Sequence, residues 1–468
     1  MVQRQYGYPN AHEYKAEQVA LYNDRKAKTQ LQILIVGCGL GGLAAAYALG
    51  QAGHNITVLE SSPAIGEVGA GIQVGPNLSR LLRKWGLERV LNDIAENDKP
   101  SWFTFHRYST GEIVGMSRLE GKLDRAYGAP WHVLHRADLY GMLFSIASPY
   151  IKLRLNSKVI HLETESIHRP SVTLQTGEVI SADLIVGADG INSTIRGYIT
   201  NQSIVAPTED VAYRVILPTH TFLSDPQLKA LIEEPTISCW MGPGRHIVGY
   251  CIRDRKEYNL VLVKRGEADT HSWTEKGDPE EMRAGFSGWE PRVQKLLSRA
   301  DSVLKSKLVI CQPLKTWIHE SGRVALLGDS CHPMLPYRAQ GSAMAIEDAA
   351  VLGNLFSRIS HPSQIPRVLK AYEELRRPRA TATQEASKSN RSVYHLPDGI
   401  RQEMRDAEMG VAMMHELLSQ EWVRGAKETT LDNSNRGNPN GWSDREKNGT
   451  QFGYDPDEAV EDWWSFNM

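Results

Sequence analysis

The sequence predicts an α/β protein in which a Rossmann-like dinucleotide-binding domain is interleaved with a β-sheet domain and followed by C-terminal helices. Residues 31–60 follow a strand–turn–helix–strand pattern, and residues 205–304 are rich in short β-type segments. After residue 341, apolar residues recur at helical spacing. A chain of 468 residues is long enough for two or three domains, so this interleaved arrangement fits its length.

The pattern at residues 31–60 carries the first functional signal. Ile33–Val36 suits a buried parallel strand, and the glycines of GCGLGG follow it at the spacing G-x-G-x-x-G before an Ala/Leu-rich helix. Gly37 permits a tight turn, Gly39 lets the backbone approach a pyrophosphate, and Gly42 lets helix and strand pack closely. Glu60 ends the next strand, where a carboxylate accepts hydrogen bonds from a ribose and repels a 2′-phosphate. The pattern predicts bound FAD or NAD rather than NADP.

Bulk composition excludes several other classes of protein. The formal net charge of −2 provides no general attraction for nucleic acid, so we expect no nucleic-acid partner. The sequence has neither a signal-type leader nor an apolar run of roughly 18 residues, which predicts a cytoplasmic protein without an integral membrane segment. The five cysteines are scattered and form no C-x-x-C pair, so neither a disulfide framework nor a zinc site is expected.

Two later segments of the sequence also predict a strand that ends in a glycine-containing turn. In GADGINSTIR the strand at residues 184–186 leads into a turn that contains Asp189. In LLGDSCHPMLPYRAQG the strand at residues 324–327 leads through Asp329 and two prolines to Gly341 and a helix. We interpret both loops as segments that grip a ligand.

These segments resemble the three sequence signatures of the group A flavin monooxygenases, the p-hydroxybenzoate hydroxylase-like aromatic hydroxylases with a GR2-type FAD-binding domain. GCGLGG is similar to the dinucleotide fingerprint, GADGINSTIR to the motif shared by FAD and pyridine nucleotide, and LLGDSCHPMLPYRAQG to the motif whose aspartate meets the ribityl chain. The resemblance covers roughly residues 31–400. HLPDG at residues 395–399 is similar to the salicylate hydroxylase-like subgroup, which includes phenol-hydroxylating enzymes of secondary metabolism.

The resemblance implies FAD as the cofactor and assigns residues to it. The loop VGAGIQVGPN is similar to a segment that touches the flavin, and LHRADL places an arginine near the ribityl and pyrophosphate groups. Backbone N–H groups at the start of the helix after residue 341 would face the flavin pyrimidine edge. The predicted FAD-binding residues are Gly37, Gly39, Gly42, Glu60, Gly71, Arg136, Asp189, Asp329, Gly341 and Ser342.

The resemblance also implies the reaction. NADPH or NADH reduces the flavin, O₂ forms a flavin C4a-hydroperoxide, and one oxygen atom is transferred to a phenolic or salicylate-like ring. Arg214 and Tyr250 match the family's substrate-binding, catalytic Arg and Tyr, because a guanidinium stabilises a phenolate. The plainer alternatives are a surface ion pair for Arg214 and a half-buried sheet aromatic for Tyr250. Weaker candidates for lining the same pocket are Trp240, Arg245 and His246, and Arg338 is either a contact for a substrate carboxylate or a solvated side chain.

The cluster at residues 328–341 also admits other interpretations, which we disfavour. A metal site lacks a second histidine or carboxylate at ligand spacing, so no metal is predicted. Cys331 and His332 are adjacent, and adjacent side chains diverge in extended backbone, which argues against a nucleophile with its base. We interpret Cys331 as a small core residue.

We predict an N-terminal extension at residues 1–30, a discontinuous FAD-binding domain at 31–205 and 305–395, and a substrate-binding sheet at 206–304. Residues 396–468 form a helical and extended tail, loosely attached from about residue 425 until Trp463 and Trp464 anchor it. The extension is either an arm that packs on a partner or a mobile tail, and the protein is a monomer or a homodimer. A flavin dehydrogenase or halogenase, or a non-catalytic FAD-binding protein, remains an alternative function, although the halogenase motif W-x-W-x-I-P is absent.

Overall fold

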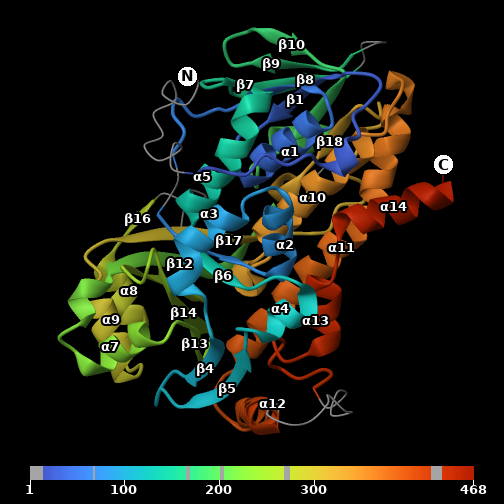
Figure 1. The fold of residues 1–468 in the computed structure, drawn as a ribbon. Helices are drawn as coiled ribbons and strands as arrows, with labels where there is room; N and C mark the ends of the chain where they lie inside the picture. Colours follow the sequence, from blue (N-terminus) through green and yellow to red (C-terminus); the bar gives the residue numbers. More distant parts are fainter. Residues whose placement is uncertain are drawn as a thin grey trace.

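The protein is described by a computed structural model with α and β elements throughout (Figure 1). The residues that the structure describes are 14–66, 69–164, 169–200, 205–267, 275–422 and 435–467. Within these ranges no helix is both long and apolar enough to cross a membrane.

A five-stranded sheet forms the centre of the dinucleotide-binding domain, and all its strand pairs are parallel. Its order is β18-β11-β1-β2-β7, with bounds Gln32–Val36 (β1), Asn55–Leu59 (β2), Ile151–Arg154 (β7), Leu184–Gly187 (β11) and Val324–Leu326 (β18). Four of these strands were expected from their apolar runs before glycine-containing loops. The parallel arrangement brings the ends of β1, β11 and β18, and therefore all three predicted loops, to one edge of the sheet.

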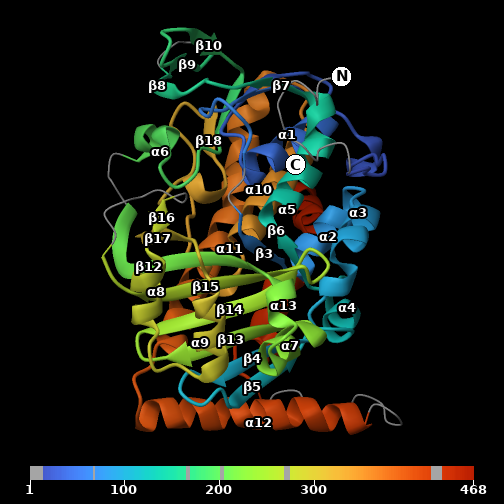
Figure 2. The same cartoon turned by 90° about the vertical axis from the view of Figure 1, so that its left-hand side faces the viewer.

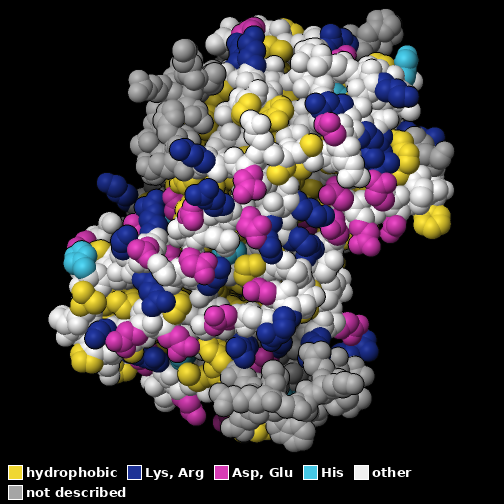
Figure 3. Space-filling model, in the orientation of Figure 1, with side chains coloured by type: hydrophobic (Ala, Val, Ile, Leu, Met, Phe, Trp, Pro, Cys, Tyr) yellow, Lys and Arg dark blue, Asp and Glu magenta, His cyan; other side chains and the backbone are white. Residues whose placement is uncertain are grey.

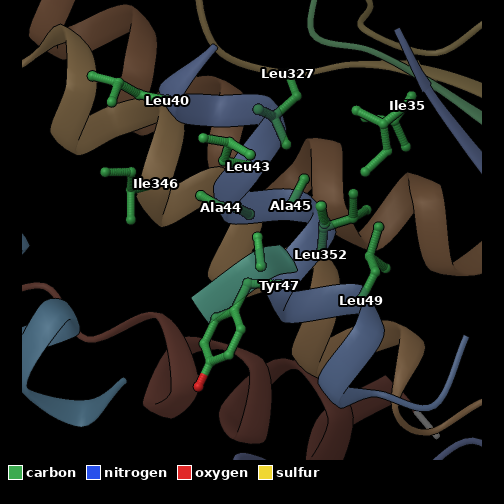
Figure 4. Packing of buried hydrophobic residues seen from close by; sticks show 14 of the residues in the cluster. Ile35, Leu40, Leu43, Ala44, Ala45, Tyr47, Leu49, Leu327, Ile346 and Leu352 are labelled. Atoms are coloured by element: carbon green, nitrogen blue, oxygen red, sulfur yellow. The ribbon is translucent and has the colours of Figure 1, made fainter. Parts of the chain in front are cut away.

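Helices α1 (Leu40–Gln51) and α10 (Gly341–Phe356) pack against each other beside this sheet. Figure 4 shows Leu43 and Ala44 of α1 near Ile346 of α10, with Leu327 and Ile35 from the strand layer close by. Both helices are apolar almost all round, as expected of helices buried between a sheet and other helices. The α/β fold class predicted from the sequence is confirmed.

A second, eight-stranded sheet has the order β16-β17-β12-β15-β14-β13-β4-β5 (Figure 2). Its strands are Trp102–Arg107 (β4), Ile113–Arg118 (β5), Val205–Pro218 (β12), Thr236–Gly242 (β13), Arg245–Ile252 (β14), Glu257–Arg265 (β15), Lys276–Gly277 (β16) and Val303–Cys311 (β17). One face is covered by Pro226–Glu233 (α7), Pro279–Gly285 (α8) and Pro291–Ser298 (α9). The predicted domain boundaries stay a prediction, but β4 and β5 belong to this sheet although they lie outside residues 206–304.

The other strands of the described residues form two smaller sheets. Gly71–Val74 (β3) pairs with His132–His135 (β6), and Val159–Glu163 (β8), Ser171–Leu174 (β9) and Val179–Ser181 (β10) form a separate sheet. The remaining α-helices are Pro76–Lys84 (α2), Glu88–Ala95 (α3), Lys122–Tyr127 (α4), Arg136–Ala147 (α5), Thr194–Ile199 (α6), Ile365–Tyr394 (α11), Ile400–Trp422 (α12), Arg445–Phe452 (α13) and Pro456–Asn467 (α14). Helix α12 lies across the end of the molecule along β5 (Figure 2).

Both ends of the chain pack more closely than the sequence suggested. The expectation of a loosely attached tail is wrong for residues 435–462, since Trp442 and Phe452 are buried and α14 lies beside α10, whereas Trp463 and Trp464 pack on the core as expected. This segment has few aliphatic residues, and aromatic and amide side chains make its packing contacts instead. Trp442, for example, meets Trp131 edge-on with ring centroids 5.0 Å apart. Residues 14–30 pack on the chain's own core, where Tyr14 donates a hydrogen bond of 2.9 Å to Asp138.

The charges are distributed evenly on the face seen in Figure 3. Lysines and arginines alternate there with aspartates and glutamates, and apolar side chains are scattered between them. On this face neither sign forms a broad patch, in keeping with the net charge of −2.

Candidate active site

The glycines of the first loop differ in what surrounds them. A Cβ on Gly37 would lie 2.3 Å from the carbonyl oxygen of Ala188, and the φ of Gly37 is +104°. A Cβ on Gly42 would lie 2.1 Å from the carbonyl oxygen of Gly37. Apart from its two chain neighbours, no atom of the described residues lies within 4 Å of a Cβ built on Gly39. The protein's own backbone therefore requires glycine at the first and third positions, whereas the second faces the open space that a pyrophosphate needs.

Glu60 braces this loop from the end of β2. One carboxylate oxygen accepts a hydrogen bond of 3.0 Å from the backbone N–H of Cys38, and the other accepts one of 2.8 Å from Ser62. The side chain remains partly exposed, so it retains the lone pairs that a ribose hydroxyl would use.

Arg196 joins the second loop to the third. Its guanidinium donates to the carbonyl oxygen of Ser330 at 3.1 Å and to that of Ile191. Asp189 accepts hydrogen bonds from Ser193 Oγ and from the backbone N–H of Ile195, so its carboxylate caps α6. Burial raises the pKa of Asp189, although the bond from Ser193 opposes this. The structure thus uses Asp189 to shape its own loop.

Asp329 has a different environment. It is exposed between buried Gly328 and Ser330, and in the described chain its carboxylate has no hydrogen-bond donor. Protein atoms nevertheless surround it closely, and this desolvation raises its pKa, while the interaction with His332 and the positive charges of Arg136 and Arg196 oppose the shift. An acceptor held ready in a recess is the group that a polyhydroxy chain such as ribityl requires.

The third loop then turns into α10. Ala339 has a left-handed backbone, with φ +52°, and the following Gln340 caps α10 without a side-chain hydrogen bond. Gly341 and Ser342 are partly exposed at this helix N-terminus, and Pro336 is exposed just before it. The free N–H groups and the helix dipole favour an anion or an electron-rich ring edge at this position.

The eight-stranded sheet turns a partly open face towards these loops. Arg214, Ile216, Val248 and Val261 lie on central strands and are partly exposed, whereas residues on the opposite face are almost fully buried under α7, α8 and α9. Side chains on the central strands of a sheet stay exposed to solvent only where no other element packs on that face. We therefore expect space for a ligand over this face, beside β3, and call that region the recess.

Tyr250 and Arg214 lie at this recess. The Tyr250 hydroxyl would be 2.7 Å from a Cβ on Gly71, and Asn259 accepts a hydrogen bond of 2.7 Å from the Gly71 backbone N–H. Burial raises the pKa of Tyr250, while the nearby charge of Arg214 and a hydrogen bond with Gln73 lower it. Three residues predicted for the site, Gly71, Arg214 and Tyr250, thus come together.

Arg214 is charged and only partly exposed. Its guanidinium donates to Ser306 Oγ at 2.7 Å. Burial and the positive charge of Arg136 lower its pKa to about 10, and Tyr250 opposes this. Arg136 begins α5, donates its backbone N–H to Ala70 at 2.8 Å, and also influences Asp329. Arg136 therefore links the sheet electrostatically to the cofactor loop.

The weaker candidates for the substrate site lie on two different faces of the eight-stranded sheet. The indole of Trp240 donates to Glu290 at 2.8 Å and belongs to the cluster under α7, α8 and α9, on the face away from Tyr250. Arg245 donates to the carbonyl oxygen of Gly285 in the same layer. His246 lies on the Tyr250 side, 2.7 Å from the ring nitrogen of His395.

Sequence reasoning missed Asn259 and Gln73, which complete the polar surroundings of Tyr250. A lone asparagine in the apolar strand YNLVLVKR was the available signal for Asn259. No comparable signal marked Gln73.

The structure also assembles a group that the sequence did not suggest. Ligand atoms of Cys331, His332 and Asp348 lie within 4.8 Å of one another and are buried. Asp348, however, already accepts hydrogen bonds from His332 Nε2 at 2.6 Å and from Arg376 at 2.8 Å. A metal cation would have to displace the guanidinium of Arg376 from Asp348. This geometry favours the prediction that no metal is bound, which stays a prediction.

Comparison with known proteins agrees with the geometry. A family described as FAD binding domain matches residues 30–387. A FAD-dependent monooxygenase, OpS4, of Beauveria bassiana is 38% identical over 385 residues, covering 81% of this chain and 89% of the relative. A 6-hydroxynicotinate 3-monooxygenase of Pseudomonas fluorescens is 34% identical, covering 77% and 91%.

Solved structures show the same fold at lower identity. A CtdE complex with FAD and substrate has a TM-score of 0.75 at 20% identity, covering 93% of this chain and 98% of that chain. A salicylate hydroxylase substrate complex has a TM-score of 0.70 at 24% identity, covering 85% and 96%. Together with the three loops and the open space at Gly39, these findings show that the chain belongs to the family of FAD-dependent aromatic monooxygenases that contain this FAD binding domain.

Proposed function

We propose that the protein is a cytoplasmic, single-component monooxygenase that consumes NADPH or NADH and hydroxylates a phenolic or salicylate-like ring. The observation that carries this proposal is the convergence of Arg214 and Tyr250 at a partly open sheet face beside the cofactor loops. Relatives support the substrate class, because the names of 6-hydroxynicotinate 3-monooxygenase and 3-amino-4-hydroxybenzoate 2-monooxygenase specify hydroxylated rings with a carboxylate.

The chain's own residues would hold the cofactor in a definite orientation. Gly39 and the start of α10 would receive the pyrophosphate and the flavin pyrimidine edge, and Asp329 would accept from the ribityl hydroxyls. Bound FAD, reduced by NAD(P)H, would supply the activation of O₂, so that one oxygen atom of O₂ enters the ring and the other leaves as water.

The sheet would prepare the substrate. The Arg214 guanidinium stabilises a phenolate oxygen, and the Tyr250 hydroxyl donates a hydrogen bond to it, which increases the nucleophilicity of the ring. Ile216, Val248 and Val261 are partly exposed apolar side chains, and the substrate ring would cover them and so displace water from them.

The purified, FAD-loaded enzyme tests this function. We expect a panel of phenols to stimulate NAD(P)H oxidation, with one ¹⁸O atom from ¹⁸O₂ in the product. Arg214→Ala should retain FAD and lower kcat/KM by about 10²–10³-fold, the usual effect of removing an oxyanion-stabilising donor. Arg265→Ala, an exposed arginine on the same sheet, is the matched control.

Unchanged product formation in Arg214→Ala would refute the role of Arg214. NAD(P)H oxidation without incorporation of labelled oxygen would favour a dehydrogenase, and a flavin that no phenol or reductant affects would favour a non-catalytic FAD-binding protein.

A further inference from the structure

Helix α12 carries a row of apolar side chains on the face that points away from the protein. The row, which we call the outer face of α12, consists of six exposed residues: Ile400, Met404, Ala407, Val411, Met414 and Leu418. The five large side chains among them are 50–75% exposed. In Figure 2, α12 forms the lower edge of the molecule, and no described element packs over this face.

The face of α12 that packs on the protein is the more polar of the two. Five buried residues form it: Gln402, Arg405, Met409, Ala412 and Glu416. Glu416 accepts a hydrogen bond of 2.6 Å from Lys122, and Arg405 donates one of 2.7 Å to the carbonyl oxygen of Val393. A surface helix ordinarily turns its apolar face towards its own core. The reversed arrangement in α12 indicates that the outer face is a second contact surface.

The spacing of the outer face is that of a helix that pairs with another helix. Its residues are separated by intervals of four, three, four, three and four positions, which are the alternating d and a positions of a heptad. The series is the same in both directions. In an antiparallel pair of α12 helices each residue faces an apolar residue of the copy, in three combinations: Ile400 with Leu418, Met404 with Met414, and Ala407 with Val411. A self-complementary surface of this kind is what a two-fold interface requires.

The outer face is also large enough for a stable interface. Its exposed side chains present roughly 500 Å² in each copy, whereas contiguous apolar patches on monomers rarely exceed a few hundred Å². Two copies would bury about 1,000 Å² of this surface, the size at which specific interfaces begin. The exposed Leu417 at the edge of the face adds to this area.

The charges beside the outer face favour a second copy over a membrane. Glu403 and Glu408 lie on its two flanks, and Arg401 is the only exposed lysine or arginine in the described part of the helix. Helices that lie on anionic membranes carry several such residues there. A parallel pair would place Glu403 of each copy beside Glu408 of the other, on both sides. An antiparallel pair leaves only Glu408 opposite its own copy, so we infer the antiparallel arrangement.

We propose that the outer face of α12 is the interface of a homodimer, in which it packs antiparallel against α12 of a second copy of this chain. The inference goes beyond the proposed hydroxylase function and does not depend on it. Because α12 packs along β5, the edge strand of the eight-stranded sheet, the dimer would also shield that end of the sheet.

Sedimentation of the full-length, FAD-loaded protein over a range of concentrations tests the proposal. We expect twice the mass of one chain, with dissociation on dilution. Val411→Glu should raise the dissociation constant of the dimer by about 100-fold or more, because each copy would bury a carboxylate without a partner. Glutamate favours a helix at least as well as valine does, so α12 and FAD retention should persist. Val179→Glu, the same change at an exposed valine on β10, should leave the dissociation constant unchanged.

Cysteine cross-linking tests the orientation. Met404→Cys and Met414→Cys, mixed at a dilution that lets subunits exchange and then concentrated, should form a cross-linked dimer under mild oxidation. Each variant alone should not, because the two copies of residue 404 lie about 15 Å apart along an antiparallel pair. The native cysteines are buried, so they do not compete.

Three results would overturn the proposal: a wild-type protein that stays monomeric at every soluble concentration, a dimer that Val411→Glu leaves intact, or cross-linking of either cysteine variant with itself. A monomer that binds vesicles of phosphatidylcholine and phosphatidylglycerol, and loses this binding in Val411→Glu, would assign the outer face to a membrane instead.

Discussion

Asp329 illustrates at the residue scale how a binding group affects stability. Its carboxylate is held without a hydrogen-bond donor in the described chain, and its pKa is raised by desolvation. The folded protein consequently binds a proton at this group more readily than the unfolded chain does. Its contribution to stability therefore falls as the pH rises from the ordinary carboxyl pKa through the raised one.

Asp329→Asn should reverse this effect in the FAD-free protein. We expect a higher melting temperature than wild type near pH 7, and a difference that disappears as the pH falls below the ordinary carboxyl pKa. FAD affinity should fall by about tenfold or more, because a charged acceptor is lost. Thermal melts across this pH range and FAD titration measure both effects, with the exposed Asp301→Asn as the control. A melting temperature lowered at neutral pH, with full FAD affinity, would contradict the role of Asp329.

At the scale of the element, glycine occurs in the turn between β1 and α1 for two different physical reasons. Gly37 and Gly42 are required by backbone contacts of 2.3 and 2.1 Å to a hypothetical Cβ, whereas among the described residues only the chain neighbours of Gly39 lie within 4 Å of such an atom. The conformation of Gly39, with φ −75°, is open to any residue. A bound pyrophosphate would account for glycine at this position.

Substitution by alanine distinguishes these reasons. Gly37→Ala should lower the yield of folded protein, because its backbone is left-handed and its Cβ would meet Ala188. Gly39→Ala should leave the melting temperature of the FAD-free protein close to wild type and weaken FAD binding, because the methyl group enters the pyrophosphate space. FAD titration and FAD-free melting curves provide the comparison. Full FAD affinity in Gly39→Ala would place the cofactor elsewhere.

At the scale of the whole molecule, a buried ionic network connects the cofactor loop to distant helices. Asp348 on α10 accepts from the Gly328 backbone and from Arg376 on α11. Glu347 accepts from Asn77 on α2 and from Arg379, which also donates to the carbonyl oxygen of Gln451 in the C-terminal segment. Four parts of the chain thus converge beneath the third loop.

The neighbouring arginines 376 and 377 test this network. Arg376→Met leaves two buried carboxylates short of a partner and should lower the free energy of unfolding by about 3–5 kcal/mol. Arg377→Met removes only a half-exposed contact of 3.8 Å with Glu373 and should cost less than about 1 kcal/mol. Denaturant unfolding of both variants measures the difference. Equal effects would show that the network does not stabilise the fold.

The sequence by itself determined the βαβ unit, the strands that lead into three loops, and the family to which those loops belong. These features are encoded locally, since glycine spacing and apolar runs fix the backbone within a few residues. Only the tertiary structure decided that Trp240 and Arg245 lie on the opposite sheet face from Tyr250, and that Asp189 caps a helix while Asp329 remains open. It also decided that Trp442 covers Arg338, because a contact between residues about a hundred positions apart depends on packing that no local pattern specifies.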